Sequence, residues 1–106
     1  MVVLETTFFT KTIKSVMSDD DYRALQNHLI SNPLAGNQIQ RSGGIRKLRW
    51  KAEGRGKRGG VRILYFWITQ QDQIYMLYAY PKNTQENLTQ AQLTLLKKAV
   101  TAELTS

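Results

Sequence analysis

The chain reads VRILYFWIT at residues 61–69, QQDQ at residues 70–73 and IYMLYAY at residues 74–80. Both apolar runs are rich in aromatic and β-branched residues, which favour β-strands, and the short polar segment between them can close a hairpin. In a hairpin, the end of the second strand returns to the start of the first. The sequence therefore predicts two antiparallel strands in which Tyr80 lies close to Arg62.

Arg62 is a charged residue within an otherwise apolar strand. Because side chains alternate between the two faces of a strand, Arg62 shares its face with Leu64, Phe66 and Ile68. Two interpretations are open at this point. Arg62 either lies at a sheet edge and extends its head group into solvent, or it is held on a rigid strand where its guanidinium can bind a phosphate through two hydrogen bonds.

Helical patterns lie on both sides of the hairpin, with apolar residues at spacings of three and four. The first helix is expected over residues 7–17. A second begins at Ser18, which together with Asp21 resembles a capping box, and a C-terminal helix begins at a similar pair, Thr89 and Gln92. The sequence therefore predicts two helices before the hairpin and one after it.

Shorter strand-like segments occur at residues 2–5 and 45–51, and residues 33–44 are typical of a loop. The resulting order, β-α-α-β-β-β-α, predicts the α+β fold class. We expect one domain over residues 1–106. Its small, largely antiparallel sheet of about four strands packs against two N-terminal helices and one C-terminal helix.

The excess of positive charge lies in one segment. Nine basic residues and one acidic residue lie between Arg41 and Arg62, whereas the rest of the chain holds six basic and seven acidic residues. A local basic excess of this kind is typical of a protein that binds a polyanion, although it also occurs in solvated loops. The candidate RNA-binding residues are Arg46, Lys47, Arg49, Lys51, Arg55 and Arg58.

The glycine-rich loop GRGKRG at residues 54–59 matches a dinucleotide-binding pattern. That pattern requires a helix after the loop, and here a strand follows from Val61, so the sequence argues against dinucleotide binding. The loop instead lets cations approach a phosphate chain closely. Together with the hairpin, it predicts that one end of the sheet collects Lys57, Arg58, Arg62, Tyr80 and Lys82.

Composition excludes several other chemistries. The chain has no cysteine and one histidine, so disulfides, thiolate metal sites, thiol nucleophiles and sites with two histidines are ruled out. The longest apolar run is too short to span a bilayer, and the first residues do not form a signal peptide. We expect a soluble, cytoplasmic protein that does not bind a membrane.

Three segments carry a resemblance to a known family: GGIRKLR at residues 43–49, GRGKRGGVRILY at residues 54–65 and LYAYPKN at residues 77–83. Together with the element order, they resemble the RelE/ParE toxin superfamily and, within it, the HigB-type toxins of bacterial toxin–antitoxin modules. The resemblance implies a RelE-like fold over almost the whole chain. One departure is that the stretch QENL at residues 85–88 lacks the tyrosine found there in RelE.

The resemblance also implies a function. Such toxins are ribosome-dependent mRNA endonucleases (mRNA interferases), which enter the A site of the 70S ribosome beside 16S rRNA and cut the codon without a metal or cofactor. A cognate antitoxin, here expected to be HigA-like, keeps them silent. Arg62 matches the strand arginine that contacts the scissile phosphate, and Lys82 matches the basic residue after the last strand.

RNA cleavage of this kind uses the 2′-hydroxyl of the substrate as the nucleophile, so the protein must neutralise the phosphorane and move protons. The candidate catalytic residues are Lys57, Arg62, Tyr80 and Lys82. Neighbouring positive charges favour Lys57 as the proton acceptor, with Lys82 or Tyr80 in the opposite role. Two alternatives stay open: a non-catalytic RNA- or rRNA-binding module, and a protein-interaction domain that receives an acidic helix.

Overall fold

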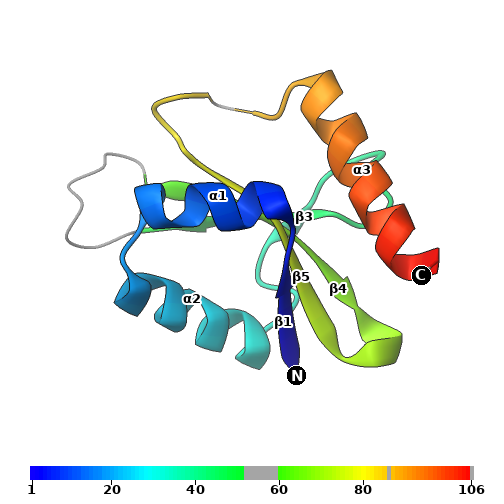
Figure 1. Ribbon diagram of the computed structural model, residues 1–106, viewed down its shortest axis with the longest axis horizontal. Coiled ribbons are helices and arrows are strands. Elements are labelled where there is room, and N and C mark those ends of the chain that lie inside the picture. The colour runs from blue at the N-terminus through cyan, green and yellow to red at the C-terminus, as the bar shows by residue number, and fades with distance from the viewer. Residues whose placement is uncertain (52–59, 86, 106) are drawn as a thin grey trace.

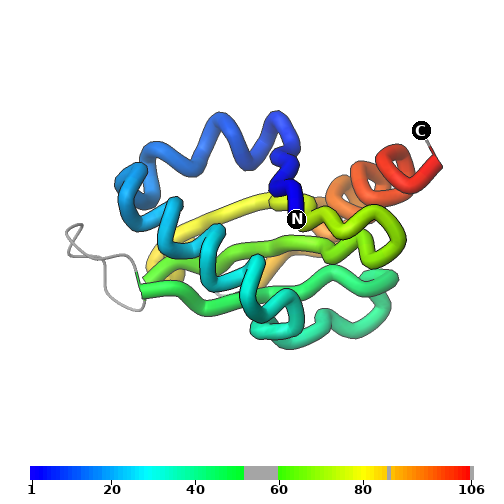
Figure 2. The backbone as a smooth tube through the Cα atoms, turned by 90° about the horizontal axis from the view of Figure 1, so that it is seen from below, coloured from blue at the N-terminus to red at the C-terminus, as the bar shows by residue number. Residues whose placement is uncertain are grey.

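The computed structural model describes residues 1–51, 60–85 and 87–105. Within these residues the chain forms a mixed sheet in the spatial order β1-β5-β4-β3-β2. The strands are β1 (Val2–Glu5), β2 (Asn37–Gln38), β3 (Arg46–Trp50), β4 (Val61–Ile68) and β5 (Gln73–Pro81). β1 pairs with β5 in parallel, and the other neighbours are antiparallel, as Figure 2 shows for the long central strands.

The α+β class and the largely antiparallel sheet are confirmed, but the described sheet has five strands rather than about four. The additional strand, β2, lies in the segment predicted to be a loop. It has only two residues, both poor strand formers, so no alternation of polar and apolar residues marks it in the sequence. It exists because Asn37 and Gln38 pair with Lys47 and Arg46 of β3.

Three α-helices lie within the described residues: α1 (Thr7–Val16), α2 (Asp19–Ser31) and α3 (Gln90–Thr105). Figure 1 shows α1 and α2 side by side, with α3 apart from them. Both predicted capping boxes have the expected N-cap contact, since Asp21 N donates to Ser18 Oγ (3.1 Å) and Gln92 N donates to Thr89 Oγ1 (3.1 Å). None of the described helices is long and apolar enough to cross a membrane.

Each face of the sheet has its own core, as the alternation in β4 predicts. Val61, Ile63 and Tyr65 pack with residues of α1 and α2, such as Phe9 and Leu25. On the opposite face a second cluster contains Ile45, Leu64, Leu77, Tyr80, Leu96 and Val100, the last two from α3. The face that carries Arg62 is therefore the face covered by α3, and we call it the α3 face.

β5 contains a bulge that bonds to the residue before α1. Leu64 pairs with Tyr78 and Tyr65 pairs with Met76, so Leu77 is an extra residue in β5. Its carbonyl accepts a hydrogen bond from Thr6 Oγ1 (2.6 Å), and the same oxygen of Thr6 accepts from Phe9 N (3.0 Å) as the N-cap of α1. Thr6 thus fixes the start of α1 against the bulge in β5.

Candidate functional site

Three candidate residues form a row across the centre of the sheet. In the strand register Arg62 of β4 lies opposite Arg49 of β3 on one side and opposite Tyr80 of β5 on the other. Directly paired residues point to the same face, with Cβ atoms about 5 Å apart. The predicted proximity of Tyr80 to Arg62 is confirmed, and Arg49 joins them.

Arg62 is buried, with 3% of its surface exposed, and Tyr80 is 2% exposed, whereas Arg49 is open to solvent. β4 has neighbours on both sides, so Arg62 does not lie at a sheet edge. This position contradicts the interpretation in which its head group extends into solvent. Burying a guanidinium is costly unless other groups compensate its charge, and Arg62 does interact with other groups of the protein.

The ends of three strands meet at one edge of this row. Lys82 N, just after β5, donates to Gly60 O (3.2 Å), just before β4. Gly60 has φ +72°, and a Cβ there would lie 2.4 Å from Trp50 O at the end of β3, so only glycine fits. Exposed Lys51 and half-buried Lys82 therefore flank Gly60. Lys57, Arg55 and Arg58 fall within residues 52–59, outside the described residues.

The remaining two candidates on β3 lie on opposite faces. Lys47 shares the α3 face with Arg49, and its Nζ donates to Asn87 Oδ1 (3.0 Å). Arg46 points to the other face, where its Nη1 donates to Gly36 O (2.7 Å). Strand alternation separates them, so Arg46 is not brought together with Arg49 and Arg62.

Arg46 instead belongs to a structural cluster around Tyr65. The Tyr65 hydroxyl donates to Pro33 O (2.7 Å) and accepts from Gly36 N (2.9 Å), which holds the segment before β2 against the sheet. Burial raises the pKa of Tyr65, while the hydrogen bond from Gly36 and the charge of Arg46 act in the opposite direction. This arrangement stabilises the fold and leaves Arg46 engaged away from the α3 face.

The aromatic residues divide in the same way. His28 is exposed and packs on the Trp50 ring, with centroids 5.4 Å apart. On the α3 face the ring centroids of Tyr78 and Tyr80 lie 5.8 Å apart and the rings are tilted by 37°.

The sequence does not predict the hydrogen bond between Lys47 and Asn87, because 40 residues separate them and no local pattern connects them.

This arrangement presents positive charge that can hold an anion. β3, β4 and β5 contain no Asp or Glu, while Lys47, Arg49 and Arg62 all point to the α3 face. Arginines on adjacent strands can hold a phosphate through charge-assisted hydrogen bonds. Lys51 and Lys82 extend the positive charge to the edge where the strand ends meet.

The protein is similar to known toxins in sequence and in fold. The sequence model described as RelE toxin of RelE / RelB toxin-antitoxin system matches residues 1–105. A solved structure of an arginine double mutant of the E. coli toxin RelE, in the free state, superposes with a TM-score of 0.58 at 11% sequence identity. The match covers 80% of this chain and 86% of that chain, and at this identity it shows the fold alone. Because the sequence match extends over almost the entire chain, the protein belongs to the RelE toxin family of toxin–antitoxin systems.

Proposed function

We propose that the protein is a HigB-type mRNA endonuclease, which inhibits translation in the cytoplasm by cleaving mRNA in the ribosomal A site. The observation that carries this proposal is the buried Arg62, held between Arg49 and Tyr80 on a face whose strands have no carboxylates. A fixed guanidinium stabilises developing negative charge without reorganising during the reaction. Membership of the RelE family supports RNA cleavage as the use of that charge.

In the proposed reaction, the 2′-hydroxyl of one nucleotide loses its proton and attacks the adjacent phosphorus. The P–O5′ bond then breaks, leaving a 2′,3′-cyclic phosphate on one fragment, and the leaving O5′ gains a proton to become a 5′-hydroxyl on the other. Arg62 neutralises the phosphorane, and Lys57 accepts the first proton. These two steps require no metal, because the nucleophile belongs to the substrate and the charge is met by arginine.

The leaving O5′ must receive one proton from a second group to become a neutral hydroxyl. The sequence leaves Lys82 and Tyr80 equally open for this role, but their positions differ. Tyr80 packs in the apolar cluster under α3 that contains Leu96 and Val100, whereas Lys82 lies half-buried beside Gly60 at the strand ends. We assign the proton-donating role to Lys82 and a positioning role beside Arg62 to Tyr80.

Dependence on the ribosome fits this small set of groups. A protein that offers few catalytic side chains relies on its partner to align the 2′-hydroxyl with the scissile bond. The 70S ribosome would provide that alignment, with Arg49, Lys51, Arg55 and Arg58 contacting mRNA or 16S rRNA phosphates. A HigA-like antitoxin would silence the protein by covering the same positive face.

The test is controlled expression in bacteria, with mapping of mRNA 5′ ends. Wild type should arrest growth and produce cuts within codons of translated messages, and Arg62→Ala should lose both. Arg23→Ala, which removes an exposed arginine of α2, is the control for loss of an arginine and should behave as wild type. RNA binding without any cuts would instead support the non-catalytic RNA-binding module, and cleavage by Arg62→Ala would remove Arg62 from the mechanism.

A further inference from the structure

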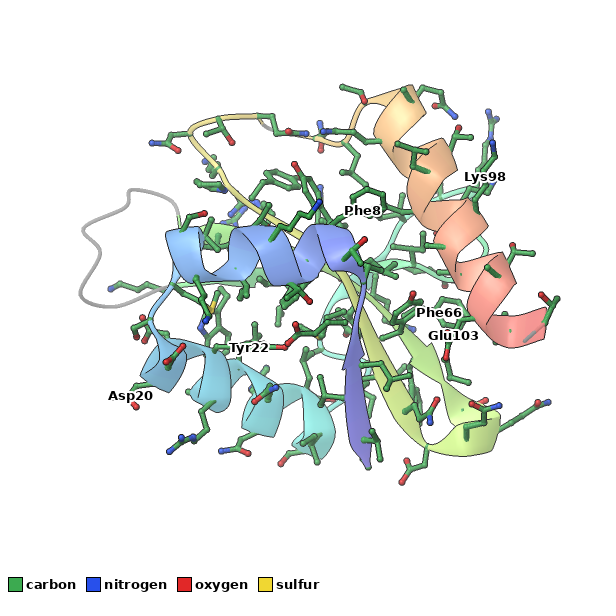
Figure 3. The ribbon with its side chains drawn as sticks, viewed as in Figure 1. Phe8, Asp20, Tyr22, Phe66, Lys98 and Glu103 are labelled. Atoms are coloured by element: carbon green, nitrogen blue, oxygen red, sulfur yellow. The ribbon has the colours of Figure 1, made fainter. Side chains whose placement is uncertain are left out.

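A cavity of about 150 Å³ opens between the start of α1 and α3, outside the row formed by Arg49, Arg62 and Tyr80. It is lined by Phe8 of α1, Tyr78 of β5, and Gln92, Leu95 and Leu96 of α3. Figure 3 shows Phe8 extending from the start of α1 toward α3. Phe8 is 44% exposed and Leu95 is 52% exposed, so large apolar side chains border a space that solvent reaches.

The walls of this cavity are held by the backbone contacts described above. Thr6 caps α1 and its hydroxyl donates to the carbonyl of Leu77. Phe8 follows Thr6 by two residues, and Tyr78 follows Leu77 directly. The bulge at Leu77 locally shifts the register of β5, and bulges commonly re-aim a neighbouring side chain beside a functional site. The two aromatic walls are therefore preorganised by the same hydrogen bond.

Two tyrosines of β5 link the cavity to the proposed phosphate position. Tyr78 lines the cavity, and its ring lies 5.8 Å from that of Tyr80, which pairs with Arg62. Residues two apart on a strand are separated by about 6.6 Å. An RNA strand whose phosphate contacts Arg62 would thus bring a neighbouring base to the cavity.

We propose that this cavity receives a nucleobase of the RNA substrate, adjacent to the phosphate bound by Arg62; this inference rests on the proposed function. A cavity of about 150 Å³ accepts a benzene-sized ring, so a pyrimidine fits it best. Bases of single-stranded RNA bind proteins by stacking on aromatic side chains. Phe8 and Tyr78 supply such surfaces.

Gln92 provides a polar group for the base edge. Its Oε1 accepts hydrogen bonds from Thr89 N (3.0 Å) and Gln85 Nε2 (2.8 Å), which fixes the orientation of the amide. Its Nε2 makes one long contact, 3.4 Å, to Gln85 Oε1 within the described residues. The amide nitrogen of Gln92 can therefore donate to a carbonyl oxygen, which both pyrimidine bases of RNA possess.

The experiment compares cut sites made by purified variants in a cell-free translation system, scored by the base beside each cut. Wild type should favour pyrimidines. Phe8→Ala and Phe8→Leu should reduce cleavage beside pyrimidines by about tenfold, since stacking is lost, whereas Phe8→Tyr should retain it. Leu95→Ala should also reduce the preference, and Leu104→Ala, a leucine of α3 with equal exposure (51%), should not.

The leucine variant separates a base from a protein partner. If Phe8→Leu cleaves with the wild-type preference, apolar area rather than stacking matters, and the cavity docks a protein instead. A wild-type preference in Phe8→Ala, or none in the wild type, also overturns the inference. Arg62→Ala in the same assay tests the proposed function separately, because full cleavage by that variant would reject the endonuclease mechanism itself. Thermal unfolding confirms that each variant is folded.

Discussion

Arg49 and Arg62 lie directly opposite each other on adjacent strands, and both point to the α3 face. Like charges in this position destabilise a sheet. A phosphate bound between them, as in the proposed function, would reduce this repulsion. Natural sites often sacrifice stability for function in this way.

The first prediction concerns that repulsion. Arg49→Gln should stabilise the free protein by about 0.5 kcal/mol, because one of two facing charges is removed. For a chain of this size, the melting temperature should rise by about 2–4 °C at low salt. Circular dichroism measures it, and Arg23→Gln on the exposed side of α2 is the control. The same variant should bind RNA more weakly, and a lower melting temperature would show that Arg49 supports the fold instead.

The second prediction concerns the salt dependence of RNA binding. Each phosphate contact that is lost should reduce the slope of log K against log salt by about 0.7 for single-stranded RNA. Lys51→Ala, at the edge where the strand ends meet, should show this change. Lys11→Ala, which removes another exposed lysine, from α1, should leave the slope unchanged. Equal slopes for wild type and Lys51→Ala would remove Lys51 from the RNA interface.

The third prediction separates Arg46 from the other basic residues of β3. Arg46→Ala removes a charge-assisted hydrogen bond to Gly36 O and should destabilise the protein by about 1–2 kcal/mol. The slope of log K for RNA binding against log salt should be the same in Arg46→Ala as in wild type, because Arg46 points away from the α3 face. Urea unfolding and salt titration measure the two effects. A reduced slope with unchanged stability would place Arg46 in the RNA interface after all.

The sequence predicts those parts of the site that depend on local patterns. Alternation in β4 and a short hairpin segment suffice to bring Tyr80 to Arg62, and side-chain chemistry suffices for the helix caps. The bulge at Leu77 and the contact between Lys47 and Asn87 depend on packing between distant segments. The pairing of Leu4 with Tyr75 cannot be predicted from the sequence either, because strand composition does not specify which strand becomes the neighbour of β1.

The fourth prediction concerns stability at alkaline pH. The Tyr22 hydroxyl donates to Glu5 Oε2 (2.5 Å), and Thr10 Oγ1 donates to Glu5 Oε1 (2.7 Å). Burial, followed by the hydrogen bond to Glu5 and its negative charge, raises the pKa of Tyr22 above its ordinary value of 10. The unfolded chain therefore loses this proton at a lower pH than the folded protein.

A group whose pKa is raised by folding contributes its stability below the unfolded pKa and loses it as pH rises toward the folded value. The free energy of unfolding should thus fall as pH rises above about 10, more steeply in the wild type than in Tyr22→Phe. Urea unfolding of both proteins between about pH 8 and 11 measures the difference, and lysine titration cancels because both share it. Parallel curves would show that Tyr22 ionises with the same pKa in the folded and unfolded chains.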